Sequence, residues 1–319
     1  MASSKIVCTV ARAETVAAAR TSIAVGSKSF AAASKLFAPA VRERAWLLYA
    51  WCRRCDDLAD GQVAGHGMRR LDDAPERLAA ITAMTEAALA GEVVGDPPFD
   101  ALRLVVAETR MPPRLPRDLV AGFALDAEDW RPRTEDDLYR YCYHVAGAVG
   151  CMMAVVMGVA PDDAATLDRA CDLGMAFQLA NIARDLSEDD AAGRCYLPTQ
   201  WLAEIDVPPG ELMRPSYRPR VAMLARRLAI RAAAFEASAR HGTPALSFRS
   251  AWAVLAAAAI YGAIGREVAR RGERAWDTRV STSGADKLRF IARAAAQATR
   301  RRRLYPPTPR DPALWTRPR

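Results

Sequence analysis

Hydrophobic side chains recur along this chain at the three- and four-residue spacing of an α-helix, and no segment alternates with the two-residue period of a strand. Proline clusters at residues 96–98, 111–116 and 207–219 and after residue 305 interrupt that spacing. The pattern predicts an all-α fold of eight to ten helices. The expected helical segments are 27–38, 41–60, 71–91, 99–110, 116–126, 135–159, 162–190, 219–240, 246–271 and 283–303.

No internal repeat or second compositional zone divides the chain before its C-terminal end. We therefore predict one domain over residues 24–303, preceded by an extension (1–23) and followed by a basic, Pro/Arg-rich tail (304–319). Two runs, 145–160 and 251–265, contain no charged residue. The first is shorter than the roughly twenty residues that span a bilayer, so we predict buried helices facing a large core or an apolar cavity.

The net charge is +8 over 319 residues, but residues 300–319 alone hold seven arginines and one aspartate. The remainder is close to balanced and lacks the basic stripe that nucleic-acid binding requires. A basic nucleic-acid-binding protein is therefore a remote alternative, and no nucleic-acid partner is expected.

Seven cysteines at irregular spacing do not form a recognisable disulfide framework. The N-terminal residues lack the apolar region of a secretory signal. Both features favour a reducing compartment, and we predict a cytoplasmic protein.

Two acidic segments carry the candidate chemistry. Asp56 and Asp60 are four residues apart, so on a helix their carboxylates lie on one face. An isolated pair of this kind is usually a solvated surface. The second segment, residues 173–189, is more informative, because its first turns are apolar and a polar stripe then emerges.

That stripe consists of Gln178, Asn181, Asp185 and Asp189, the last three at four-residue intervals. Burying an ionised carboxylate is unfavourable unless a cation neutralises its charge. Carboxylate and amide oxygens suit Mg²⁺, which typically bridges such ligands to substrate phosphates. Arg53 and Arg184 lie within a turn of the two acidic segments, and the planar guanidinium fits diphosphate oxygens. The residues therefore point to a Mg²⁺–diphosphate site at an apolar cavity, as an isoprenoid diphosphate would need.

At these residues the chain resembles the squalene/phytoene synthase family of head-to-head prenyltransferases. Four blocks match in order, at residues 27–30, 49–60, 141–150 and 173–202. The last includes GMAFQLANIARDLSEDDAAGRCYLP, which is a long and specific signature. The resemblance covers about residues 24–300 and implies an isoprenoid synthase fold with a central cavity.

The resemblance also implies roles for individual residues. It assigns metal binding to Asp56, Asp60, Asn181, Asp185 and Asp189. It assigns diphosphate contacts to Ser27, Lys28, Ser29, Arg53, Arg184, Arg194 and Arg279. It places Tyr49, Tyr141, Tyr196 and Tyr261 around the reacting centre, although Tyr261 is equally typical of a core aromatic. It lines the chain cavity with Phe30, Ser34, Val145, Ala146, Gly150 and Gln178.

In this family one allylic diphosphate ionises, a second molecule attacks the cation, and a cyclopropyl diphosphate forms and rearranges. We expect Mg²⁺, or Mn²⁺ in its place, as cofactor and two C20 geranylgeranyl diphosphates as substrates, giving phytoene without NADPH. The small Ser34, one turn after Phe30, would leave depth for a C20 chain. Squalene or dehydrosqualene synthesis from two C15 farnesyl diphosphates is the alternative.

The basic tail acquires a different interpretation once the substrate is an isoprenoid. Such a substrate and its product are membrane-soluble, so we expect the arginines of residues 300–319 to contact anionic lipid at the inner face of the membrane. The protein would then be cytoplasmic and peripheral on that face.

Overall fold

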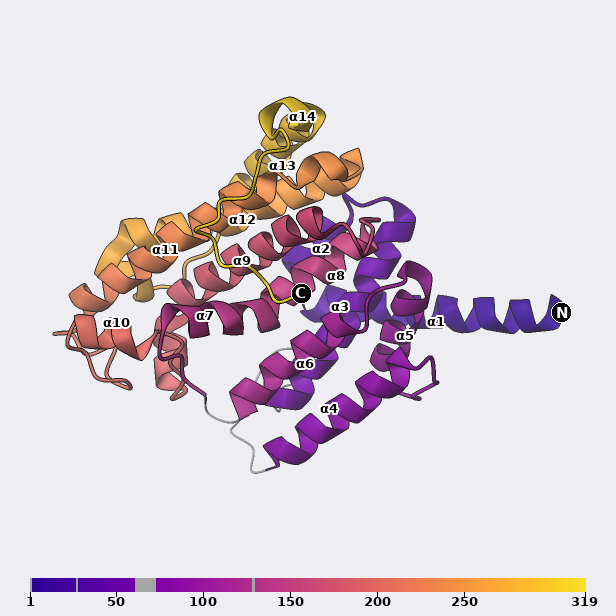
Figure 1. The fold of residues 1–319 in the computed structure, drawn as a ribbon, viewed down its shortest axis with the longest axis horizontal. Coiled ribbons are helices and arrows are strands. Elements are labelled where there is room, and N and C mark those ends of the chain that lie inside the picture. Colours follow the sequence, from indigo (N-terminus) through magenta and orange to yellow (C-terminus); the bar gives the residue numbers. More distant parts are fainter. Residues whose placement is uncertain (1, 27, 61–72, 128–129) are drawn as a thin grey trace. The chain divides into compact units, whose positions relative to one another are not determined.

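The computed structural model describes residues 2–26, 28–60, 73–127 and 130–319, except for the side chains of residues 2–11, 28, 29, 32, 60 and 127 (Figure 1). Every regular element among these residues is helical, which confirms the predicted all-α fold class. The chain forms two compact units. Unit 1 comprises residues 1–128 and 152–162, and unit 2 comprises residues 129–151 and 163–319.

Unit 1 is built around the amphipathic helix α3. Against α3 pack α1, α2, α4, α5 and α6, and fully buried Trp51 and Leu48 form its inner face. Phe99 and Leu102 of α5 complete this core. The helices are α1 (Ala2–Gly26), α2 (Lys28–Ser34), α3 (Pro39–Asp60), α4 (Ala74–Leu89), α5 (Pro97–Thr109) and α6 (Arg114–Ala127).

Unit 2 is built around the 28-residue helix α9 (Ala164–Ala191), which α7, α11 and α12 contact. Asp163 caps its N-terminus, with the side chain accepting a hydrogen bond from the Thr166 amide. The other helices are α7 (Glu135–Cys142), η1 (Tyr143–Gly147), α8 (Ala148–Val156), α10 (Thr199–Glu204), α11 (Arg218–Arg240), η2 (Thr243–Ala245), α12 (Phe248–Arg271), η3 (Gly272–Trp276), α13 (Gly284–Thr299) and α14 (Arg301–Leu304). The division into units falls within α8, so its residues 152–156 belong to unit 1.

The two charge-free runs are both helical, as predicted. By length and composition alone, residues 248–276 would be apolar enough to cross a membrane. Within unit 2 this helix packs against α9, α11 and α13, as a core helix does. The other run is not a single α-helix, because residues 143–147 form a turn of π-helix before α8 begins.

Glycines allow the π-turn and α8 to lie directly against the backbone of α9. A Cβ atom on Gly174 would lie 2.2 Å from the Ala146 carbonyl oxygen, and one on Gly150 would lie 2.3 Å from that of Ala170. No side chain fits in either space, so both positions require glycine. This contact fixes the longitudinal register of α9 against the preceding segment.

Residues of the predicted N-terminal extension and of the predicted C-terminal tail form ion pairs with the rest of the chain. The predicted boundary at residue 23 falls inside α1, where Arg12 forms ion pairs with Glu43 and Glu108. At the other end, Arg310 and Arg317 form ion pairs within unit 2 and are mostly buried. These two arginines are therefore not available to lipid, contrary to the expectation for the whole tail.

Candidate active site residues and their surroundings

The first acidic segment forms the C-terminal turns of α3. The carboxylate of Asp56 lies 3.5 Å from the guanidinium of Arg53, and the Asp56 side chain is 40% exposed. The Arg53 Nε donates to the Tyr49 hydroxyl oxygen at 3.4 Å. Burial lowers the pKa of Arg53, but Tyr49 and Asp56 raise it overall, so the guanidinium remains charged. The side chain of Asp60 lies outside the described residues.

Tyr49 is held between α1, α2 and α3. Its ring lies 5.6 Å from that of Phe30, and a Cβ atom on Gly26 would be 2.6 Å from its hydroxyl oxygen. Three residues of the predicted site, Tyr49, Phe30 and Arg53, are thus gathered in unit 1. Of the predicted diphosphate contacts on this side, Ser27 and the side chains of Lys28 and Ser29 lie outside the described residues.

The second acidic segment occupies the C-terminal half of α9. Both carboxylate oxygens of Asp185 accept hydrogen bonds from Arg184, and Arg279 lies 3.0 Å from one of them. Arg279 also forms an ion pair with Glu188. The hydrogen bond to Glu188 and the charge of Asp185 raise the pKa of Arg279. The predicted residues Arg184, Asp185 and Arg279 therefore form one cluster.

Asn181, one turn before Asp185, has a buried side-chain oxygen without a hydrogen-bond partner. A buried oxygen without a hydrogen bond lowers the stability of the fold unless a ligand binds to it. An amide oxygen beside carboxylates is also a donor that Mg²⁺ accepts. The residues present on this helix face therefore fit a hard divalent cation.

The predicted metal ligands are divided between the two units. Asp56 and Asp60 belong to unit 1, whereas Asn181, Asp185 and Asp189 belong to unit 2. Among the described side chains, no group of three or more His, Cys, Asp or Glu residues could hold a metal ion. The metal assignment stays a prediction.

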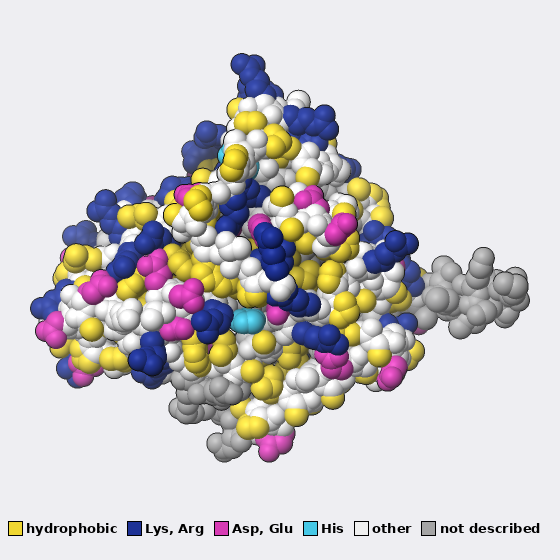
Figure 2. All heavy atoms as spheres, in the orientation of Figure 1, with side chains coloured by type: hydrophobic (Ala, Val, Ile, Leu, Met, Phe, Trp, Pro, Cys, Tyr) yellow, Lys and Arg dark blue, Asp and Glu magenta, His cyan; other side chains and the backbone are white. Residues whose placement is uncertain are grey.

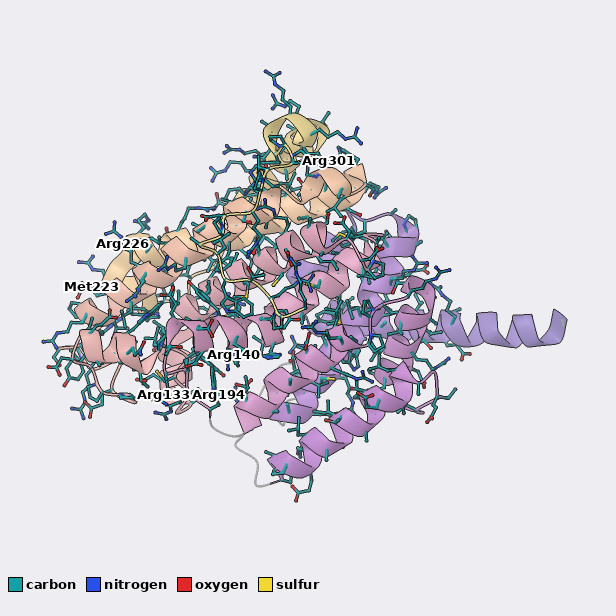
Figure 3. The ribbon with its side chains drawn as sticks, in the orientation of Figure 1. Arg133, Arg140, Arg194, Met223, Arg226 and Arg301 are labelled. Atoms are coloured by element: carbon teal, nitrogen blue, oxygen red, sulfur yellow. The ribbon has the colours of Figure 1, made fainter. Side chains whose placement is uncertain are left out.

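The loop that follows α9 is joined to the loop that precedes α7. The Arg194 amide donates to the Asp189 carbonyl oxygen at 2.8 Å, which turns the chain back at the end of α9. Arg131 donates to the Gly193 carbonyl oxygen at 3.3 Å, and the Thr199 amide donates to that of Pro132 at 2.9 Å. Figure 3 shows the stick side chain of Arg194 emerging from this region.

This loop contact brings two predicted tyrosines together. The rings of Tyr141 and Tyr196 are stacked with centroids 4.8 Å apart, and Trp130 stacks on Tyr141 at 5.7 Å. Both tyrosines are less than a tenth exposed. Trp130 was not anticipated, since a single tryptophan outside any helical pattern carries no distinguishing signal in the sequence.

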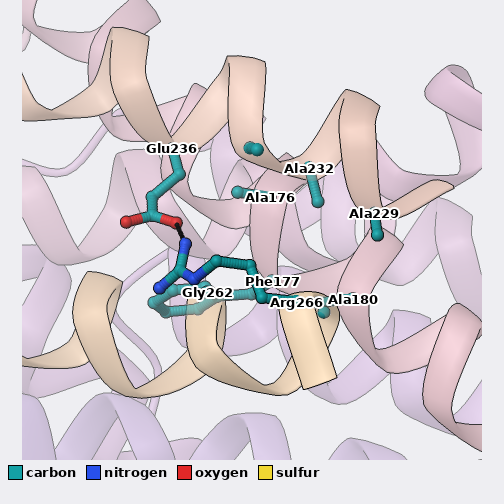
Figure 4. Close-up of a pocket in the computed structure, with 10 residues that line it drawn as sticks. Ala176, Phe177, Ala180, Ala229, Ala232, Glu236, Gly262 and Arg266 are labelled. Carbon is teal, nitrogen blue, oxygen red and sulfur yellow. Dashed lines mark hydrogen bonds and ion pairs between the residues drawn. The ribbon is translucent and has the colours of Figure 1, made fainter. Parts of the chain in front are cut away.

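The fourth predicted tyrosine, Tyr261, stacks on Phe177 with centroids 4.2 Å apart. Phe177 lines a small pocket between α9, α11 and α12 (Figure 4). Its polar edge is the ion pair between Glu236 and Arg266, at 3.0 Å. The other lining residues are small or apolar: Ala176, Ala180, Ala229, Ala232, Ala233, Gly262 and Gly265.

Four of the predicted cavity residues lie on the π-turn, on α8 and on α9. Val145 and Ala146 belong to the π-turn, a local geometry that is frequent at functional sites, and both are partly exposed. Gly150 lies against the backbone of α9, so its observed role is close packing. Gln178 lies on α9, one turn before Asn181.

Ser34 is fully buried in unit 1 and is hydrogen-bonded to its neighbours. Its hydroxyl donates to the Ala31 carbonyl oxygen at 2.8 Å and accepts from the Trp46 indole at 2.9 Å. The partner Trp46 could not be identified from the sequence, because the two residues lie on different helices. The proposed influence of Ser34 on chain length stays a prediction.

The comparisons with known proteins identify the family of this chain. The squalene/phytoene synthase family matches residues 23–286. The 15-cis-phytoene synthase of Enterobacter agglomerans is 47% identical over 296 residues, covering 92% of this chain and 99% of that protein. The 15-cis-phytoene synthase of Pantoea ananas is 45% identical over 300 residues, covering 93% and 96%.

Solved structures share the fold. A dehydrosqualene synthase in complex with a ligand superposes with a TM-score of 0.80 at 27% identity, covering 91% of this chain and 98% of that one. A squalene synthase from Alicyclobacillus acidocaldarius gives a TM-score of 0.71 at 24% identity, covering 82% and 96%. The all-α isoprenoid synthase fold is therefore confirmed, and the chain belongs to the squalene/phytoene synthase family.

Proposed function

We propose that this chain is a phytoene synthase, a prenyltransferase that condenses two geranylgeranyl diphosphates head to head in carotenoid biosynthesis. Relatives that are 43–47% identical over more than nine-tenths of the chain carry that activity in their names. The structural observation that carries the proposal is the face of α9, where the unpartnered oxygen of Asn181 precedes Asp185 and its two arginines.

The metal requirement follows from the leaving group. Diphosphate carries several negative charges, and bound Mg²⁺ would neutralise the charge that develops as it departs. We propose that the aspartates of α3 bind Mg²⁺ in unit 1 and that those of α9, with Asn181, bind it in unit 2, and Mn²⁺ is expected to substitute. In the same reaction Arg184 and Arg279 would exchange a carboxylate partner for diphosphate oxygens, since a guanidinium binds both types of oxyanion in the same bidentate manner.

The aromatic residues fit the carbocation steps that follow loss of diphosphate. Carbocations must be shielded from water, and a π face stabilises positive charge. The stacked pair Tyr141 and Tyr196 provides such a surface, and we propose that it faces the intermediates. We propose the same role, close to the reacting carbons, for Tyr49 and Tyr261.

The proposal is tested by product formation from geranylgeranyl diphosphate and Mg²⁺. The wild-type protein should release diphosphate and give extractable phytoene without NADPH. Asp56→Ala and Asp185→Ala should abolish turnover while the helical circular dichroism stays near normal, whereas Asp206→Asn, at a fully exposed carboxylate, should have no effect. Full activity in either alanine variant would reject the metal assignment.

Farnesyl diphosphate is the competing substrate, because the dehydrosqualene synthase has the same fold. Assays with C15 and C20 diphosphates side by side separate the two. We expect preference for C20, and a clear preference for C15 would replace the proposed activity by squalene or dehydrosqualene synthesis.

We also propose that the protein is cytoplasmic and binds anionic membrane peripherally. Arg300, Arg302 and Arg303 are exposed next to Leu304, whose side chain is 43% exposed, and Figure 2 shows Lys and Arg side chains gathered around this end of unit 2. Replacing the three arginines with glutamine should weaken sedimentation with vesicles containing anionic phospholipid. Unchanged binding would reject this surface, and equal binding to vesicles of neutral lipid would reject its electrostatic basis.

A further inference from the structure

The last fifteen residues of the chain, 305–319, lie along unit 2 as an extended segment. In Figure 1 this yellow trace leaves α14, crosses α12 and α9, and ends beside α7. Its first contacts are with the end of α11: His241 Nδ1 lies 2.8 Å from the Pro306 carbonyl oxygen, and Tyr305 packs against Arg240. We call residues 305–319 the C-terminal clasp.

The central contact of the clasp is the ion pair of Arg310 with Asp172 of α9. Asp172 is completely buried, and both of its oxygens accept hydrogen bonds from Arg310, at 2.6 to 3.2 Å. Ser238 of α11 donates to the same carboxylate. Burial raises the pKa of Asp172, and Arg310 and Ser238 act against that rise. Loss of Arg310 would leave the charge of Asp172 buried without a partner, which is strongly destabilising.

A second carboxylate, Asp168, lies one turn earlier on the same face of α9. It accepts hydrogen bonds from Arg317 at 2.7 Å and from Arg319 at 3.2 Å. The Arg317 side chain is only 9% exposed. Two carboxylates four residues apart in a buried position would repel each other, and the clasp supplies arginines to both.

The clasp also contacts the segment that carries Tyr141. The Trp315 indole donates to Asp136 of α7 at 2.8 Å, and its ring lies 5.8 Å from that of Tyr143 in the π-turn. The carbonyl oxygen of Trp315 accepts from Arg310 at 2.7 Å, which joins this contact to the ion pair on α9. One short segment therefore links α7, the π-turn, α9 and α11.

The clasp holds the face of α9 that is opposite the proposed ligand face. Asn181 follows Asp172 by nine residues, which is about two and a half helical turns. The carboxylates that the clasp binds therefore point away from the polar stripe. Because α9 is continuous from residue 164 to 191, fixing its rotation at Asp172 also fixes the direction in which Asn181 and Asp185 point.

We propose that residues 305–319 position the catalytic face of α9, with Arg310 and Arg317 as positioning residues that act through Asp172 and Asp168. The inference rests on the proposed function only in taking that face as catalytic. Small displacements of metal ligands lower the rate strongly, by as much as about a hundredfold per ångström. Release of the clasp should therefore affect metal binding and kcat more than the affinity for the isoprenoid chain.

The test uses Asp168→Asn combined with Asp172→Asn, which releases the arginines without leaving a charged carboxylate buried. Asp206→Asn combined with Glu273→Gln is the matched control, since it removes two exposed carboxylates from the same unit. The readouts are amide hydrogen exchange of residues 173–191, Mn²⁺ binding in the presence of diphosphate measured by electron paramagnetic resonance, and the separate values of kcat and KM.

In the clasp-released variant we expect about tenfold faster exchange over residues 173–191, about tenfold weaker Mn²⁺ binding and a kcat lowered by at least the same factor. KM for the prenyl diphosphate should change less than twofold, and the control should match the wild type. Truncation after Leu304 should reproduce these effects in the wild type and add little in the clasp-released variant, because the clasp is already open there.

A lower melting temperature with unchanged exchange, Mn²⁺ binding and kcat would overturn the proposal and leave the clasp a purely structural element. The proposal would also be overturned if truncation and the double substitution each lowered kcat and Mn²⁺ binding, and the two effects combined in full in a protein that carries both changes. The exchange measurement does not depend on catalysis. An inactive wild-type protein would therefore refute the proposed function alone, and unchanged exchange in an active variant would refute the clasp alone.

Discussion

Substitution of Gly174 by alanine tests whether the close approach of α9 to the π-turn holds unit 2 together. The added Cβ atom would meet three backbone atoms, at 2.2 Å from the Ala146 oxygen, 2.6 Å from its carbonyl carbon and 2.8 Å from the Gly147 Cα. Ordinary van der Waals contact begins at 3.4 Å, so one element must move by more than 1 Å. Backbone in a helical turn cannot move that far without breaking its own hydrogen bonds.

The size of the effect follows from two opposed contributions. Alanine gains about 1 kcal/mol of helix propensity over glycine. Overpacking of a closed contact costs about 3 kcal/mol or more when no flexible side chain can give way. We therefore expect the free energy of unfolding to fall by about 2 kcal/mol, which lowers the melting temperature by roughly 4–8 °C for a unit of this size.

The assay is thermal denaturation followed by circular dichroism, together with turnover at a temperature where the variant is folded. Gly284→Ala and Gly265→Ala are the controls. A Cβ atom at Gly284 meets nothing within 4 Å, and one at Gly265 meets only side chains at 3.6 and 3.9 Å. Both controls should be neutral or slightly stabilising. If Gly174→Ala is as stable as these controls, the contact does not constrain α9 and the reasoning fails.

Three further substitutions probe other contacts. Burial raises the pKa of Glu108, but hydrogen bonds from two arginines lower it by more, so the net pKa lies below its ordinary value of 4.5. The contribution of Glu108 to the stability of the fold is therefore complete above pH 4.5 and is lost as the pH falls through the folded-state pKa. Glu108→Gln should cost about 1 kcal/mol at pH 7 and less at pH 3 in urea unfolding; an equal cost at both would contradict the pairing. Ser34→Ala removes the acceptor of Trp46 and should cost about 1 kcal/mol, with a red-shifted tryptophan emission as the check. Gly262→Ala places a Cβ atom at 2.0 Å from the Glu236 carboxylate and should lower the melting temperature, whereas tolerance would mean that the ion pair relaxes freely.

The helical fold could be predicted from sequence because hydrophobic spacing is a local property. The break at residues 143–147 could not, since a π-turn results from how the segment meets α9 through Gly150 and Gly174. Apolar periodicity is the same on both sides of that break. The prediction of a single helix over 135–159 was therefore wrong in its continuity and right in its burial.

The site was predictable to the extent that its residues recur at fixed helical intervals. Asn181 and Asp185 were predicted as candidates in this way, and Arg184 directly precedes Asp185 in sequence. A contact between residues far apart in sequence leaves no such pattern and could not be predicted. Arg310 and Asp172, for example, are separated by 138 residues. A buried carboxylate in an apolar helix does indicate that some cation must reach it, and the basic tail was the available source, but charge counting alone favoured a lipid contact.

The arginines around Asp185 have a consequence for the protein before any substrate arrives. Its carboxylate is already neutralised by cations of its own chain, Arg184 and Arg279, so this part of the fold does not depend on a foreign ion for its charge balance. A zinc finger, by contrast, is unfolded without its metal. Purification in the presence of a chelator should therefore leave α9 folded, and loss of activity on chelation should be reversible. Under the proposed metal assignment, a cation that binds Asp185 would displace a guanidinium, which would favour a cation that arrives together with an anion able to bind the released arginine.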